Sequence, residues 1–219
     1  MDLLVALTRM TAIWLWLLAA SRLGPALGGD TALLLGHLGA VGFALGRPRR
    51  EMATSWLSAF ARGWLAGVVG YKGWQAAIVV LGLAAGLQPA AVSQADPGFS
   101  ALLRLCVLAP VWEEALYRGR LLPALARRVG APAAVALSSL AFALPHVQPW
   151  AVLGTFLVGC GLGSIERHSR RLGLCIGIHA GLNAAASFWG AAGAGPGVAL
   201  ASGLAFWALV LKGGRDDVR

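Results

Sequence analysis

The sequence has little charge for its length. Only 12% of its 219 residues are charged, and only nine of these are acidic. Soluble domains carry about 25% charged residues, so the composition argues against a soluble enzyme or binding domain. The hydrophobic fraction is 58% and the mean hydropathy is +0.72. Apolar runs of this extent predict helices that cross a bilayer, because a spanning segment must satisfy its own backbone hydrogen bonds.

Signatures of several other protein classes are also missing. The three cysteines form no CxxC pair, so we expect Cys106, Cys160 and Cys175 to be small buried side chains rather than disulfides. There is no internal repeat. The first apolar run, residues 3–28, is too long for the core of a cleavable signal peptide and predicts a first span. The net charge of +9 comes from arginine clusters between apolar runs, so no nucleic-acid partner is expected.

The hydrophobic pattern predicts an all-α, polytopic transmembrane bundle of about eight spans in one structural domain. Within it we distinguish N-terminal helices (1–98), a motif-bearing catalytic core (99–190) and a last helix with a basic tail (191–219). The eight predicted spans are 3–22, 31–46, 64–87, 99–118 with a continuation to about 128, 131–147, 150–166, 172–190 and 195–212.

The connections between these spans alternate in charge, which predicts their sidedness. Basic connections alternate with connections that contain no Lys or Arg, and the positive-inside rule then places both termini in the cytoplasm. Residues 53–63 predict a separate amphipathic helix on the cytoplasmic surface. The basic connections are 47–50, 118–128, 167–171 and 212–215, and the others are 23–30, 88–98, 147–149 and 190–195.

The stretch WEEALYRGR places four charges inside a predicted span. A charge at membrane depth costs about 2.5–3.5 kcal/mol on insertion scales, so such residues face the bundle interior and are functional by default. Glu114 and Arg118 are four residues apart and share a helix face, as do Glu113 and Tyr117. We therefore expect Arg118 to hold one carboxylate while the other stays free for chemistry.

Two further polar groups are predicted at the same depth. His146 ends the run FALPH, and His179 and Asn183 share one helix face in HAGLN, among small residues that permit close helix packing. If the chain turns at Gly130, Glu113 and His146 lie at similar distances from that turn. The two carboxylates, the arginine, the two histidines and the asparagine can then meet in one membrane layer.

Such a constellation predicts peptide hydrolysis without a covalent intermediate. A carboxylate beside a histidine can deprotonate a water, and a histidine with an asparagine can donate hydrogen bonds to an oxyanion. Ser138, Ser139 and Cys175 are not placed as nucleophiles. A zinc site made by Glu113, His146 and His179 is the alternative, although HExxH is absent and Arg118 disfavours a cation. The primary expectation is that the site needs no cofactor.

Three motifs now carry a family resemblance. EEALYR (113–118), FALPH (142–146) and HAGLN (179–183) match EExxxR, FxxxH and HxxxN in that order. In this respect the chain resembles the CPBP intramembrane proteases, or Abi family, which includes the type II CAAX prenyl endopeptidases. The resemblance covers about residues 100–190.

The resemblance implies a role for each matching residue. Glu113 is the implied general base, His146 helps to activate the water, and His179 and Asn183 form the oxyanion hole. Glu114, Arg118, Tyr117 and Phe142 support the site.

The resemblance also implies a substrate, namely a membrane-anchored or lipidated protein, such as a C-terminal sorting tail or a CAAX-like or bacteriocin-type peptide. The richness of the sequence in Ala, Gly, Leu and Arg suggests a bacterial genome, so the expected location is a bacterial inner membrane. Rival hypotheses are a membrane transporter that uses the same polar residues as a proton relay, and a non-catalytic immunity scaffold.

Overall fold

The computed structural model describes residues 3–45, 54–87, 98–189 and 195–212, and every regular element in these ranges is helical. The all-α prediction is therefore confirmed for this part of the chain. The helices are α1 (Leu3–Arg22), α2 (Gly24–Leu27), α3 (Gly29–Leu45), α4 (Thr54–Ala84), α5 (Phe99–Leu103), η1 (Arg104–Leu108), α6 (Ala109–Leu116), η2 (Tyr117–Leu121), α7 (Leu122–Val129), α8 (Ala131–Ala143), η3 (Leu144–His146), α9 (Pro149–Ser169), α10 (Leu172–Trp189) and α11 (Pro196–Lys212).

Four helices are long and apolar enough to cross a membrane, namely Leu3–Arg22, Trp56–Ala84, Pro149–Ser169 and Leu172–Trp189. Two shorter apolar helices cover Ala131–His146 and Pro196–Leu211. Each of the eight predicted spans is helical over most of its described residues, and residues 85–87, 147 and 195 lie outside the helices. The number of crossings and the cytoplasmic termini stay predictions.

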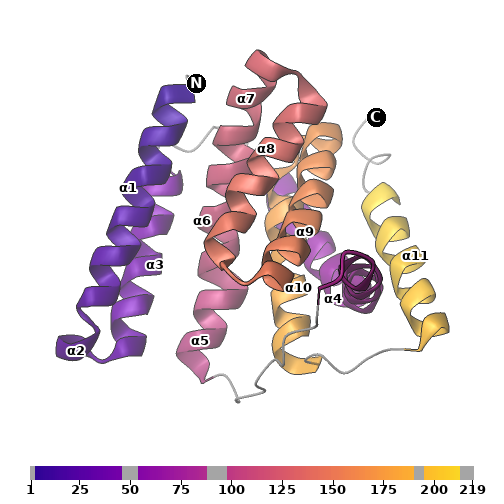
Figure 1. Ribbon diagram of the computed structural model, residues 1–219, viewed down its shortest axis with the longest axis horizontal. Helices are drawn as coiled ribbons and strands as arrows, with labels where there is room; N and C mark the ends of the chain where they lie inside the picture. The colour runs from indigo at the N-terminus through magenta and orange to yellow at the C-terminus, as the bar shows by residue number, and fades with distance from the viewer. Residues whose placement is uncertain (1–2, 46–53, 88–97, 190–194, 213–219) are drawn as a thin grey trace.

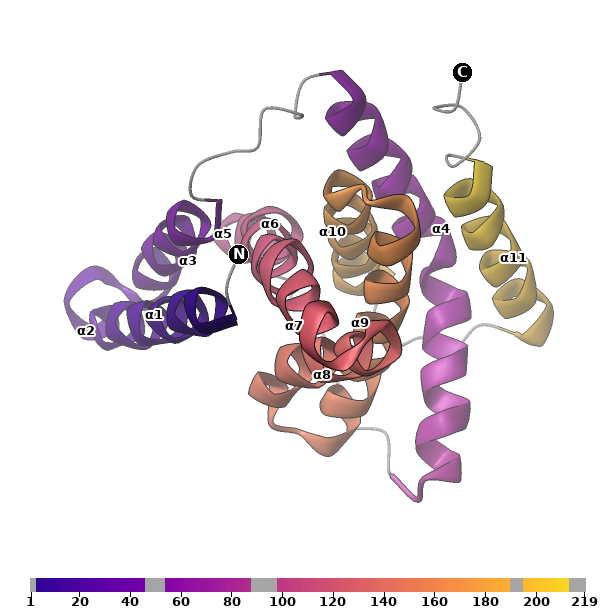
Figure 2. The same ribbon diagram turned by 90° about the horizontal axis from the view of Figure 1, so that it is seen from above.

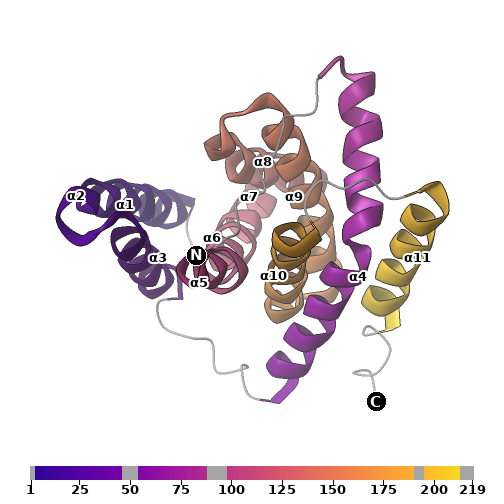
Figure 3. The same cartoon turned by 90° about the horizontal axis from the view of Figure 1, so that it is seen from below.

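The helices are arranged in successive layers (Figure 1). The α1–α3 pair packs on one side of the continuous rod that runs from α5 to α7, and α8, α9 and α10 pack on its other side. Beyond them, α4 lies between α10 and α11, as the views from above and below show (Figures 2 and 3). The rod therefore has helices on two sides, and its polar residues face the middle of the bundle.

The predicted surface helix at 53–63 is wrong for its described residues. Residues 54–63 are the first turns of α4, which continues without a break to Ala84. They pack against α10, where a Cβ added to Gly177 would lie 2.2 Å from the carbonyl oxygen of Phe60. A Cβ on Gly181 would lie 2.2 Å from the carbonyl oxygen of Trp64. The backbones of the two helices therefore touch, which a helix lying on the membrane surface would not allow.

The long rod contains two π-helical turns among its described residues, and each ends two residues before a proline. In η1 the N–H of Ala109 bonds to the carbonyl of Arg104, and in η2 the N–H of Leu122 bonds to the carbonyl of Tyr117. Pro110 and Pro123 follow directly. Proline lacks an N–H and clashes with the carbonyl four residues earlier, and a π turn relieves this clash while the helix continues. The rod reaches Gly130, which has a φ of +80° and turns the chain into α8 as predicted.

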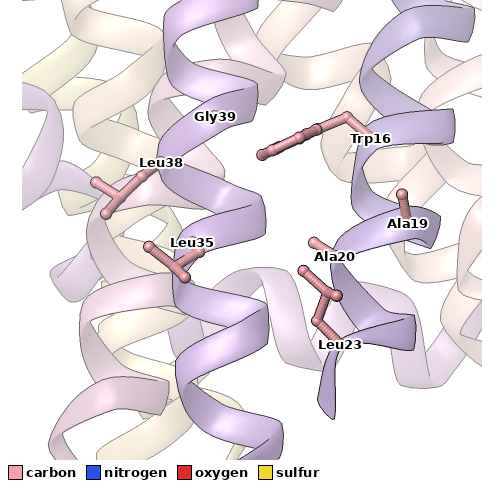
Figure 4. A pocket seen from close by; sticks show the side chains of 7 residues that line it. All are labelled: Trp16, Ala19, Ala20, Leu23, Leu35, Leu38 and Gly39. Atoms are coloured by element: carbon pink, nitrogen blue, oxygen red, sulfur yellow. The ribbon is translucent and has the colours of Figure 1, made fainter. Parts of the chain in front are cut away.

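An apolar cleft of about 450 Å³ lies between α1 and α3 (Figure 4). Trp16 spans it and donates a hydrogen bond from Nε1 to the carbonyl of Gly36, at 2.9 Å. No titratable side chain lines the cleft, so it has no groups for the predicted chemistry. The lining residues are Trp16, Ala19, Ala20, Leu23, Leu35, Leu38 and Gly39.

Candidate active site

The polar residues of the EEALYR stretch point into the bundle from the middle of the rod. Glu114 on α6 and Arg118 on η2 are both almost completely buried. Arg118 donates a hydrogen bond from Nη1 to Glu114 Oε1 at 3.0 Å. The predicted pairing of this arginine with one of the two carboxylates is therefore confirmed. Separating such a buried pair would leave an uncompensated charge, which is costly. The pairing therefore holds both side chains in place.

Three groups from three different helices hold the guanidinium of Arg118. Besides Glu114, its Nη2 donates to the carbonyl oxygen of Gly159 on α9, at 3.1 Å. The ring of Phe142 on α8 lies below it, with 4.4 Å from the guanidinium carbon to the ring centroid. Phe142 also contacts the ring of Tyr117, at 5.3 Å between centroids. The supporting residues Arg118, Phe142 and Tyr117 thus form one contact network.

His179 on α10 lies between the two adjacent carboxylates. Its Nδ1 is 2.9 Å from Glu114 Oε1, which is a hydrogen bond. Its Nε2 is 3.6 Å from Glu113 Oε2, which is ion-pair distance but longer than a hydrogen bond. The ring of His179 packs edge-on against Phe142, at 5.6 Å between centroids. Glu113 keeps a side chain that is 17% exposed, whereas Glu114 is fully enclosed. Glu113 is therefore the carboxylate with access to a substrate.

These contacts restrict the protons that His179 can carry. Glu114 Oε1 accepts a hydrogen bond from Arg118, and an ionised carboxylate is an acceptor only. His179 must therefore carry a proton on Nδ1, and its Nε2 faces Glu113 either as a lone pair or as a second N–H. With the second proton, Glu113, Glu114, Arg118 and His179 together have no net charge. The cluster can therefore stabilise an imidazolium that donates from Nε2.

His146 lies beside the site through its contact with Phe142. It lies in the 3₁₀ turn η3 after α8, and its ring contacts Phe142 at 5.9 Å between centroids. Its Nδ1 is 3.2 Å from the carbonyl of Ala143, so Nδ1 is the donor and Nε2 has a lone pair. The turn that joins α8 to α9 lies partway along the bundle, well short of the end that α5 and α10 reach (Figure 1). His146 and His179 thus flank the same Phe142 ring, and Glu113 pairs with His179.

Asn183 lies one turn after His179 and links α10 to the rod. Its Nδ2 donates to the carbonyl oxygen of Leu105 at 2.8 Å. In the π turn that carbonyl would need an N–H from Pro110, which has none. The side chain of Asn183 therefore satisfies an acceptor that the proline leaves without a backbone donor. An amide nitrogen has two hydrogens, so one remains for the site.

The zinc alternative does not fit the described residues. No three His, Cys, Asp or Glu side chains in this part of the chain gather at metal-ligand spacing. His179 Nδ1 is already bonded to Glu114, and the contacts of His146 are to Phe142 and Ala143. Glu113, His146 and His179 therefore do not form a three-ligand set in this arrangement, and no chemical step below is assigned to a metal.

The side chains examined as nucleophiles are occupied or enclosed. Ser138 Oγ donates to the carbonyl of Val135 at 3.2 Å, and Ser139 is fully buried. Cys175 Sγ is 3.5 Å from the carbonyl of Leu162 and 3.7 Å from Glu166 Oε2. No hydrogen bond among the described residues joins any of them to Glu113, and the attack by a water stays a prediction.

Two partners in the site were missed from the sequence. The carbonyls of Gly159 and Leu105 hold Arg118 and Asn183, and backbone acceptors leave no mark in a motif search. For Leu105 a signal was present, because Pro110 five residues later removes the donor that a π turn requires. For Gly159 the only sign was the small-residue run GCGLG at 159–163.

The comparison with known families agrees with the three motifs. Residues 95–185 match the family model of the type II CAAX prenyl endopeptidases, Rce1-like. No curated protein and no solved structure matches the chain. The matched segment runs from just before α5 into α10 and contains every residue of the candidate site. The resemblance to the CPBP intramembrane proteases is therefore confirmed over this segment, and the family implies a membrane-embedded protease.

Proposed function

We propose that this chain, with its segment of the type II CAAX prenyl endopeptidase type, is an intramembrane endopeptidase that uses an activated water. It hydrolyses a peptide bond of a membrane-anchored protein substrate. One observation carries the proposal: the imidazole of His179 lies between Glu114, which Arg118 fixes, and Glu113, which is left without a hydrogen bond among the described residues. This is a positioned histidine beside a partly accessible carboxylate, in a largely buried part of the bundle.

Glu113 is the general base that takes a proton from the attacking water. It is partly exposed, and its Oε2 lies 3.6 Å from Nε2 of His179. His146 orients the same water through its Nε2 lone pair, since its Nδ1 is used by the carbonyl of Ala143. The proton then passes to the leaving amine, as general acid–base catalysis requires.

His179 and Asn183 form the oxyanion hole. Both come from one face of α10, and each has a donor left after its structural hydrogen bond: Nε2–H of the imidazolium, and the second Nδ2 hydrogen. Donors fixed before the reaction stabilise the charge that develops on the carbonyl oxygen. Glu114, Arg118, Phe142 and Tyr117 support them by fixing the ring of His179 and its charge.

The proposed substrates are C-terminal sorting tails, CAAX-like peptides or bacteriocin-type peptides in a bacterial inner membrane. The matched family is named for cleavage of prenylated CAAX proteins, and the burial of the site in an apolar bundle suits a lipid-anchored chain. The proposal includes no cofactor, and zinc dependence is the alternative that the experiment must separate.

The test is cleavage by detergent-purified protein of a panel of tail-anchored and prenylated peptides. We expect Glu113→Ala, His146→Ala and His179→Ala to fold and to lose roughly 10²–10⁴-fold in rate, the usual contribution of general acid–base groups. His168→Ala is the control, because His168 is exposed at the end of α9. Processing at the wild-type rate by all three variants would contradict the proposal.

A strong chelator separates the two mechanisms. Cleavage that survives in metal-free protein and disappears in Glu113→Ala supports the glutamate–histidine water mechanism. Cleavage that requires stoichiometric zinc would make Glu113, His146 and His179 ligands instead, and would require the site to rearrange on metal binding.

A further inference from the structure

Helix α9 carries no family motif, yet its backbone reaches the centre of the site. The carbonyl oxygen of Gly159 accepts a hydrogen bond from Arg118 Nη2 at 3.1 Å. Arg118 is only 1% exposed and Gly159 is also buried. We propose that Gly159 is a positioning residue of the site, which sets the place of the Arg118 guanidinium and through it the ring of His179. The catalytic part of this inference rests on the proposed function.

Residue 159 has room only for a hydrogen. A Cβ built on it would lie 2.9 Å from Ser139 Cβ, 3.1 Å from Ser139 Oγ and 3.2 Å from Arg118 Nη2. Ser139 is fully buried on α8, and its Cβ is held in place by the helix backbone. Any side chain at position 159 therefore moves α8, Arg118 or both.

A shift of Arg118 is transmitted directly to the histidine. The guanidinium is planar and rigid, so a push on Nη2 also moves Nη1. Nη1 donates to Glu114 Oε1, the same oxygen that accepts from His179 Nδ1. Three hydrogen bonds in series therefore connect Gly159 to the catalytic imidazole, by way of the buried side chains of Arg118 and Glu114.

Other glycines of α9 provide matched controls. A Cβ on Gly163 would lie 3.2 Å from Val135 Cγ1, so it tests tight packing of α9 on α8 without contacting Arg118. A Cβ on Gly154 would lie 3.4 Å from Ile78 Cγ2, which is an ordinary contact. All three glycines lie within the same helix, so a change to alanine has the same intrinsic effect on helix formation.

The first experiment compares kcat and KM of the three alanine variants in the peptide-cleavage assay. We expect Gly159→Ala to lower kcat by about 10²-fold with KM changed by less than about threefold, because small misplacements of catalytic groups act on the chemical step. Gly163→Ala and Gly154→Ala should stay within about threefold of the wild type in both constants. An active Gly159→Ala protein, or an equal loss in Gly163→Ala, would overturn the proposal.

The second experiment needs no substrate and therefore separates this proposal from the proposed function. It is a double-mutant cycle on the melting temperature in detergent, with Gly159→Ala and Arg118→Met alone and together. Residues in contact give non-additive effects. If Gly159 acts through Arg118, the loss caused by Gly159→Ala is at least halved when Arg118 is Met. An equal loss in both backgrounds overturns the proposal, even if the wild-type protein cleaves nothing.

Discussion

At the scale of single residues, the site depends on a buried charge that has no access to water. Arg118 is the only cation that contacts Glu114 among the described residues, apart from a protonated His179. Its other contacts are the Gly159 carbonyl and the Phe142 ring. A planar guanidinium can make both contacts at once, and other side chains cannot. The arginine therefore stabilises the fold as well as the proposed chemistry.

Replacing Arg118 should be costly, and a second change should restore part of the loss. Arg118→Met leaves the Glu114 carboxylate buried beside one histidine, and such uncompensated charges cost about 3–5 kcal/mol of stability. Adding Glu114→Gln removes the charge and should recover most of that loss. Denaturant unfolding in micelles measures both, with Arg167→Met at the exposed end of α9 as the control. Equal unfolding of Arg118→Met and Arg167→Met would contradict the ion-pair assignment.

Asn183 is expected to have two separable functions. Asn183→Ala should lower kcat by roughly 10²-fold, the usual cost of one oxyanion donor. It should also cost about 1 kcal/mol of stability, because the Leu105 carbonyl loses its donor. In a Pro110→Ala background the new N–H can reach that carbonyl, so the stability cost should vanish while the kcat loss remains. A stability loss alone, with kcat unchanged, would leave Asn183 as a link between helices only.

At the scale of helices, close backbone contact decides how α10 is placed. Gly177 and Gly181 let it touch Phe60 and Trp64 of α4. Small residues at this spacing allow helices to approach within a membrane, where apolar side chains have no hydrophobic drive to associate. His179 lies on the same helix between these glycines, so the α4–α10 contact sets where the imidazole lies relative to the rod.

Alanine in place of these glycines should therefore destabilise the bundle. In Gly177→Ala the new Cβ would meet a backbone carbonyl at 2.2 Å, and the backbone cannot rotate away as a side chain could. We expect a loss of about 1–3 kcal/mol, the usual cost of overpacking. Gly203→Ala on α11 is the control, since a Cβ there has nothing within 4 Å. Thermal unfolding compares the two, and equal stability would contradict the close approach of α4 and α10.

At the scale of the whole molecule, the sequence predicted elements better than contacts. The predicted span 3–22 coincides with α1, whose last residue is Arg22, and the turn at Gly130 was marked by a glycine and a proline. The start of α4 was missed, because its polar residues suggested a surface helix and nothing showed that α10 covers it. The contact of His179 with Glu114 joins residues 65 positions apart. Helix spacing gave their depth, but only the rotation of the packed helices brings them together.

The sidedness of the bundle stays a prediction, and it is argued from charge and from the arrangement of the helix ends. The start of α1, the α7–α8 turn and the end of α11 lie at one end of the molecule, and α2 and the start of α5 lie at the other (Figure 1). Because Arg127 and Arg128 lie in the last turn of α7, the positive-inside rule places the first end in the cytoplasm.

Epitope tags at the two termini should both be protected in spheroplasts, and a tag inserted at 88–97 should be accessible. Termini on opposite sides would mean an odd number of crossings. That outcome would require one predicted span to enter the membrane without crossing it, and the helices α8 and α11 would be the first to examine because they are the shortest apolar ones.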